Sequence, residues 1–100
     1  MEDGTNLVAL AHAVATAETG NCKTGSALTH KNAFGIMNWK TGERQLTRYK
    51  SCNESFQAFY ELWKRKYKIY PTKDLADMWT GKDRADNWIR IVNATYPKYL

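Results

Sequence analysis

Apolar side chains recur at helical spacing over residues 7–19, and this periodicity constrains the fold more than any other feature of the chain. The positions that share one face are Leu7, Leu10, Ala11 and Val14. Asn6 is a residue type that caps helix N-termini well, and Gly20 is a typical C-terminal stop. We therefore expect a helix from Leu7 to Thr19 with one buried face.

A second helix is predicted to begin at Ser51, because Ser51 and Glu54 match the capping-box pattern. This helix carries an aromatic stripe on one face. The stripe consists of Phe56, Phe59, Tyr60, Trp63 and Tyr67. We expect these rings to form core rather than a ligand platform, and Pro71 to end the helix.

Two shorter helical segments follow. Thr72 can cap a third helix that runs to Gly81, and Asp83 or Asp86 is expected to open a last helix that ends at Pro97. Its inward positions are Trp88, Ile89, Val92 and Tyr96.

The segment between the first two long helices has a different pattern. Residues 21–31 are rich in Gly, Ser, Thr and Lys and are predicted to form a loop. Residues 34–38 and 45–49 are predicted to be short strands that pair through a turn at residues 40–43. The expected fold is mainly α, with about four helices and a small β-hairpin between helices one and two.

The length of 100 residues predicts one domain spanning residues 1–100. No apolar run approaches the length that spans a membrane, so we expect no membrane span. Residues 1–6 are polar and acidic, which does not fit a secretory signal. Three explanations stay open: a signal that this chain lacks, a module of a larger protein, or export by other machinery.

The formal net charge is +5, and basic residues are dense at Lys64, Arg65, Lys66 and Lys68. A basic surface favours polyanionic partners such as nucleic acid, anionic lipid or bacterial wall polymer, whereas a solvated helix face is the simpler interpretation. No nucleic-acid-binding motif accompanies the cluster, so we expect no nucleic-acid partner.

The two cysteines, Cys22 and Cys52, are compatible with a disulfide or with two free thiols. They have no matching His pattern, so no zinc site is predicted. Nothing in the sequence indicates a cofactor or a metal ion.

Glu18 lies four residues after Val14 and continues the predicted buried face. Burial disfavours ionisation of a carboxyl group, and cleavage of a glycosidic bond needs an acid that keeps its proton. Glu18 is therefore the candidate general acid; the alternative is a helix-end glutamate turned into solvent. Glu43, in the predicted turn, is the candidate second carboxylate, and its alternative is a solvated turn residue.

A sugar-binding cleft needs aromatic faces and polar groups close to the acid. The aromatic candidates in or beside the hairpin are Phe34, Trp39 and Tyr49. Asn32 and Asn38 are candidate partners for an N-acetyl group. Gly35 indicates close backbone approach to a substrate or to the first helix. For Trp39, binding and core packing are both open.

Three motifs resemble the peptidoglycan-cleaving part of the lysozyme-like superfamily. They are Glu18-Thr19, then Asn32-Ala33-Phe34-Gly35-Ile36-Met37, then Tyr49-x-Ser51-x-x-Glu54-Ser55. Their order and spacing are similar to those of bacterial and phage glucosaminidases. The first motif and Gly35-Ile36-Met37 also resemble lytic transglycosylases. The resemblance covers about residues 7–67.

The resemblance implies a lysozyme-like α+β fold and cleavage of the N-acetylglucosamine and N-acetylmuramic acid backbone. It implies that Glu18 is the general acid, that Phe34, Gly35 and Ile36 line the groove, and that Tyr49 lies near the catalytic glutamate. A second acid from the hairpin would be Glu43.

Departures from the family pattern leave the chemistry open. Thr19 replaces the usual Ser, Ala33 replaces Asn, and Asn38 stands where transglycosylases carry Gln. Hydrolysis, intramolecular transglycosylation and glycan binding without catalysis all remain as alternatives. The implied partner is peptidoglycan or a chitin-like oligosaccharide, bound by a monomer or a module of a larger protein. The implied location is outside the cell, at the cell wall or on a phage virion.

Overall fold

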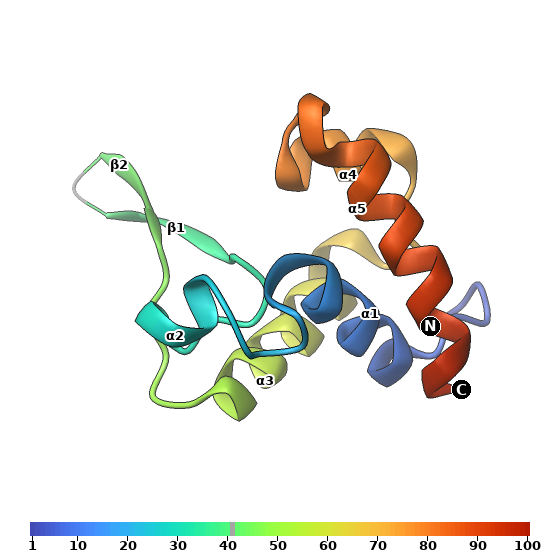
Figure 1. The fold of residues 1–100 in the computed structure, drawn as a ribbon, viewed down its shortest axis with the longest axis horizontal. Helices are drawn as coiled ribbons and strands as arrows, with labels where there is room; N and C mark the ends of the chain where they lie inside the picture. The colour runs from blue at the N-terminus through green and yellow to red at the C-terminus, as the bar shows by residue number, and fades with distance from the viewer. Residues whose placement is uncertain (41) are drawn as a thin grey trace.

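The computed structural model describes residues 1–40 and 42–100, and its described part is mainly helical with one small hairpin (Figure 1). The elements in order are α1 (Leu7–Thr19), α2 (Ser26–His30), β1 (Met37–Lys40), β2 (Glu43–Leu46), α3 (Cys52–Leu62), the π-helical turn η1 (Trp63–Tyr67), α4 (Lys73–Thr80), α5 (Lys82–Thr95) and the 3₁₀ turn η2 (Tyr96–Tyr99). The predicted fold class, mainly α with a small hairpin, is confirmed.

Helix α1 is the centre of the molecule. Figure 1 shows α3 and α5 on different sides of it, and α1 packs against both. The side chain of Asn6 accepts the Ala9 N–H at 3.0 Å, and Gly20 adopts a left-handed φ of 60°, so both predicted caps are confirmed.

The expectation of one buried face on α1 is too narrow. Ala9, Ala13 and Ala15 are as fully buried as Leu10 and Val14. Small side chains on the other faces let neighbouring elements approach closely, so the helix is enclosed on more than one side.

The aromatic stripe of α3 packs as core, as predicted. Phe59 stacks on Phe34 with 4.4 Å between ring centroids and on Trp63 with 4.6 Å, and all three side chains are fully buried. Trp63 also meets Trp79 of α4 edge-on at 5.6 Å. This ring cluster joins α3 and α4 beneath the segment that leads into the hairpin.

The hairpin is real, but its strands are displaced from the predicted ranges. Met37 pairs with Leu46 and Lys40 with Glu43 in an antiparallel register. The predicted turn at residues 40–43 includes Thr41, which lies outside the described residues. The first strand begins later than expected because residues 32–36 form a turn rather than extended chain.

The side chain of Asn32 holds that turn. Its Nδ2 donates to the carbonyls of Ile36 at 2.9 Å and Thr47 at 2.8 Å. Its Oδ1 accepts the N–H groups of Phe34 at 3.2 Å and Ile36 at 3.1 Å. One buried amide thus fixes both the turn and the base of the hairpin.

The prediction of a loop over residues 21–31 is wrong at α2. The Ser26 hydroxyl donates to the Asn32 carbonyl at 2.7 Å, and the Asn32 N–H donates to the Ser26 carbonyl at 3.2 Å. These contacts stabilise a single helical turn that local composition does not favour. The hairpin therefore follows α2 rather than α1.

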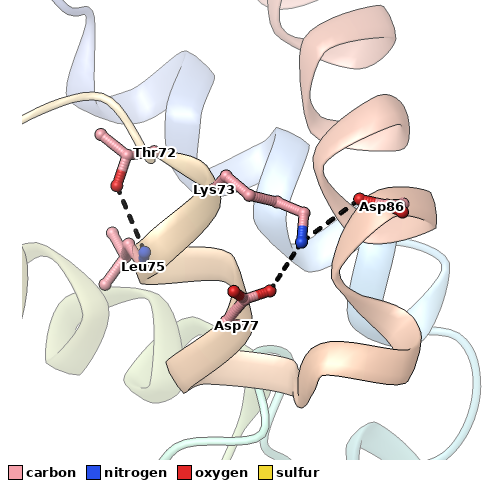
Figure 2. Close-up of polar contacts among 5 residues, drawn as sticks. All are labelled: Thr72, Lys73, Leu75, Asp77 and Asp86. Atoms are coloured by element: carbon pink, nitrogen blue, oxygen red, sulfur yellow. Dashed lines mark hydrogen bonds and ion pairs between the residues drawn. The ribbon is translucent and has the colours of Figure 1, made fainter.

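Helices α4 and α5 form a corner that is held by polar contacts (Figure 2). Thr72 caps α4 by accepting the Leu75 N–H at 3.2 Å, as predicted. Lys73 lies 2.8 Å from Asp77 and 3.3 Å from Asp86, which joins the two helices.

The predicted cap of the last helix is wrong. Gly81 occupies the N-cap of α5, and no side chain caps it. Asp83 lies in the first turn, and Asp86 pairs with Lys73 instead. The last helix ends at Thr95, and Pro97 lies within η2.

Cys22 and Cys52 form a disulfide with 6.4 Å between their Cα atoms. It joins the segment after α1 to the first residue of α3. Within the described residues, no helix is long and apolar enough to cross a membrane.

Candidate functional site

Glu18 lies in the last turn of α1, where its carboxyl group meets the C-terminal helices. The indole Nε1–H of Trp88, on α5, donates to Glu18 Oε1 at 2.9 Å. Trp88 is almost fully buried, whereas Glu18 is only half-buried. The carboxyl group is therefore held by a rigid partner but keeps access to solvent.

Burial raises the pKa of Glu18 above its ordinary value. Three groups oppose this effect: the hydrogen bond from Trp88, the positive charge of Arg84 and the nearby indole of Trp79. The indole N–H of Trp79 also donates to the Phe34 carbonyl at 3.2 Å. Desolvation is the largest contribution, so the protonated form is favoured relative to an exposed glutamate.

The surface beside Glu18 is hollowed on the hairpin side, and we call this depression the hairpin hollow. It has a volume of about 390 Å³. Its described lining comprises residues 35–39 and Arg44 from the hairpin segment, Leu62, Lys66 and Tyr67 from the end of α3 and η1, and Met78 and Trp79 from α4. Two walls from distant parts of the chain thus face each other.

Gly35 brings the hairpin hollow up to Glu18. Its φ is +69°, and a Cβ placed on it would lie 3.4 Å from Glu18 Oε2. A side chain here would contact the carboxyl group, and the left-handed φ would strain its backbone. The close approach expected from Gly35 is therefore toward the first helix, at its catalytic candidate.

A second depression, the helix hollow, lies on the α5 side of Glu18 and has a volume of about 400 Å³. It is lined by Ala17 and Glu18 of α1, Thr80 of α4, and Asp83, Arg84, Asn87 and Trp88 of α5. Glu18 lines this hollow directly. It does not line the hairpin hollow, but its carboxyl group lies next to Gly35, which does.

The structure brings together most of the predicted groove residues. Gly35, Ile36, Asn38 and Trp39 all line the hairpin hollow. Trp39 is 75% exposed, which excludes it from the core and leaves its ring open to a ligand.

Two predicted binding residues are instead parts of the scaffold. Asn32 is fully buried, and its amide already makes four hydrogen bonds to the main chain, so it has no group left for an N-acetyl substituent. Phe34 is also fully buried, between Phe56 and Phe59. Both support the floor of the hollow from below, and the expectation that they contact sugar is corrected.

Glu43 and Tyr49 are not brought to Glu18. Glu43 is exposed at the start of β2, at the end of the hairpin that projects away from α1 in Figure 1. Neither residue is among the described residues that line either hollow. The Tyr49 N–H donates to the His30 carbonyl at 2.8 Å, and burial raises the pKa of its phenol.

Sequence reasoning missed the residues that surround Glu18 from the C-terminal half. Trp88 was expected only to face inward, and neither Trp79 nor Arg84 was singled out as a site residue. The four-residue spacing of Arg84 and Trp88 places both on one face of α5, but nothing local indicates that this face meets α1. Asp83, expected to be a cap, lines the helix hollow with Glu18.

The arrangement can donate a proton to a ligand that contacts Glu18. An acid with a raised pKa lies at the edge of a groove that has an exposed aromatic ring and open solvent access. Among the described residues, no cluster of His, Cys, Asp and Glu side chains has the geometry to hold a metal ion.

Comparison with known proteins gives no further assignment. The chain matches no protein-family model, no curated protein and no solved structure.

Proposed function

We propose that this protein cleaves the glycan backbone of peptidoglycan, with Glu18 as the general acid that protonates the leaving oxygen. The observation that carries the proposal is the position of Glu18, which lines the helix hollow, lies next to Gly35 of the hairpin hollow, and is half-buried and hydrogen-bonded by Trp88. Glycosidic cleavage requires such an acid, held protonated by its surroundings.

The groove supports a glycan as the ligand. Trp39 and Met78, on opposite walls of the hairpin hollow, are 75% and 55% exposed. Apolar surface of this kind suits the C–H faces of sugar rings, and Asn38 on the same surface supplies an amide for hydroxyl or acetamide groups.

The disulfide supports action outside the cytoplasm, at a cell wall or on a virion. Cystines persist in oxidising compartments and are rare in the cytosol. A net charge of +5 is also suited to an anionic wall.

A lytic transglycosylase is the second candidate, because Glu43, the expected second carboxylate, does not accompany Glu18; the carboxylate that lines the helix hollow with Glu18 is Asp83. Glu43 is not among the described residues that line either hollow. Transglycosylases work with one glutamate, because the substrate's own hydroxyl replaces water and yields an anhydro-muramyl end. A glycan-binding module without turnover would use the same groove and lack products altogether.

The test is incubation of purified peptidoglycan with wild type, Glu18→Gln and Glu43→Gln, followed by mass spectrometry of the released fragments. The two variants make the same carboxyl-to-amide change, one inside the site and one outside it. We expect Glu18→Gln to lose roughly 10²–10⁴-fold in rate and Glu43→Gln to retain activity.

The products distinguish the candidates. Reducing ends indicate a hydrolase, and the terminal sugar identifies the bond. Anhydro-muramyl ends indicate a transglycosylase. Full activity of Glu18→Gln, or no products from wild type, would reject the proposal.

A further inference from the structure

We infer that the hairpin hollow is a binding subsite for carboxylate groups carried beside a glycan strand, with Arg44 and Lys66 as its cations. This inference rests on the proposed function, because it names the part of the substrate that the groove recognises.

The two cations come from opposite walls. Arg44 pairs with Trp39 in the hairpin register, and cross-strand partners project from the same face of a sheet. Both line the hollow. On the other wall, Lys66 Nζ lies 5.3 Å from the centroid of the Tyr67 ring, and both of these residues also line the hollow.

The π-helical turn η1 determines where Lys66 projects. It interrupts the α-helical spacing after α3, and such turns are frequent at functional sites because they redirect side chains. Lys66 lines the hairpin hollow, whereas its neighbour Arg65, on the same turn, lines neither hollow.

The described residues give Arg44 and Lys66 no acidic partner within 4.0 Å. Among the described residues, the ion pairs within 4.0 Å all involve Lys73, and no acidic side chain lines the hairpin hollow. Glu18 adjoins the hollow at Gly35 but is not part of its lining. The hollow is therefore positively charged without compensation from its own walls.

A chitin-like chain is neutral and has no carboxylate with which Arg44 and Lys66 could pair. A peptidoglycan strand carries its stem peptides on the lactyl ethers of alternate sugars, and those peptides end in carboxylates. When a stem is removed, the lactyl group itself becomes a carboxylate. Hydrogen bonds between a cation and a carboxylate are stronger than those between neutral groups, so they can discriminate between the two kinds of glycan.

The test is equilibrium binding to the Glu18→Gln variant, which separates recognition from cleavage. The probes are chitohexaose, a teichoic-acid-free peptidoglycan hexasaccharide with its stems, and the same hexasaccharide after amidase treatment. We expect the stem-bearing hexasaccharide to bind roughly tenfold more tightly than chitohexaose at low salt.

Adding Arg44→Gln and Lys66→Gln should bring the ratio of these two affinities close to one. The matched control, Lys64→Gln with Arg65→Gln, also removes two positive charges, from positions on η1 that line neither hollow, and it should leave the ratio unchanged. If the amidase-treated probe binds tightly, the contact is the lactyl carboxylate. If the amidase-treated probe binds weakly, the contact is a carboxylate of the stem peptide. Either result supports a carboxylate subsite.

Equal affinity for all three probes would overturn the inference, as would a loss of preference in the Lys64→Gln, Arg65→Gln control equal to that in the Arg44→Gln, Lys66→Gln variant. The second outcome would mean that only net charge matters. Failure of the wild type to cleave peptidoglycan would reject the proposed function, but it would leave this binding preference measurable and separately decided.

Discussion

The two oxygens of Glu18 lie in different surroundings. Oε1 accepts the indole N–H of Trp88 at 2.9 Å, whereas Oε2 lies 3.4 Å from the position that a Cβ on Gly35 would occupy. In the proposed mechanism Oε2 carries the proton, and Trp88 holds the other oxygen in place. Trp88 is then a positioning residue.

Trp88→Phe should move the alkaline limb of the pH–rate profile to higher pH. The Trp88 hydrogen bond stabilises the carboxylate and lowers the pKa of Glu18, so its removal raises that pKa further. The acid then keeps its proton at higher pH. The measurement is kcat/KM on peptidoglycan fragments across pH.

Trp39→Phe is the matched control, since Trp39 lines the hairpin hollow but makes no hydrogen bond to Glu18. It should raise KM and leave the limb in place. An unmoved limb in Trp88→Phe, with the fold intact by circular dichroism, would contradict the role given to the indole.

Glu18→Gln should stabilise the folded protein at neutral pH. The pKa of Glu18 is higher in the folded state than in the unfolded state. The free energy of unfolding of the wild type therefore falls as pH rises from the ordinary glutamate pKa through the folded-state pKa. Below both values the wild-type side chain is protonated and resembles glutamine, so the difference should vanish there.

Urea unfolding of both proteins at acidic and neutral pH measures this difference. If the Gln variant is less stable than wild type at neutral pH, the site stabilises the ionised form of Glu18 rather than the protonated form, which would contradict the prediction.

At the scale of elements, local sequence signals located helix ends but not the contacts between elements. Asn6, Ser51 and Thr72 each accept an N–H from a residue three positions later, so their roles are readable from the sequence. The start of β1 depends on the hydrogen bond from Asn32 to Thr47, and α2 depends on the bond between Ser26 and Asn32. No local sequence pattern predicts either bond.

Thr72→Ala should destabilise the protein by about 1 kcal/mol, because the Leu75 N–H at the start of α4 loses its partner. Thr72→Ser keeps the hydroxyl and should stay close to wild type. Chemical denaturation gives both values. Equal losses in the two variants would mean that the methyl group, and not the cap, is the source of the effect.

At the scale of the molecule, the site is formed by segments far apart in the chain. Glu18 and residues 35–39 could be proposed from the sequence because each has a local signal. For Glu18 it is the helical spacing of residues 7–19, and for residues 35–39 it is the strand and turn pattern. Sequence reasoning did not identify Trp88, which is 70 positions from Glu18, because only the packing of α5 on α1 brings them together. For the same reason it placed Glu43 beside Glu18. The position of Glu43 in the sequence does not reveal in which direction the hairpin projects.

The Cys22–Cys52 disulfide should contribute about 3 kcal/mol to the free energy of unfolding, since it closes a loop with a sequence separation of 30. The double substitution Cys22→Ser with Cys52→Ser should lower stability by that amount in oxidising buffer and be insensitive to reductant. Wild type should lose stability only when reductant is added. No response of wild type to reductant would contradict the pairing.

The proposed role of Glu18 is to donate a proton to the leaving oxygen. It is tested most directly by changing the acidity of the leaving group, because a strongly acidic leaving group departs without protonation. Wild type and Glu18→Gln are compared on a natural glycan fragment and on an aryl chito-oligosaccharide with a strongly acidic phenol as leaving group. We expect Glu18→Gln to lose roughly 10²–10⁴-fold in rate on the natural fragment and much less on the aryl substrate. Equal losses on the two substrates would contradict the claim, because the missing carboxyl group would then have some role other than proton donation.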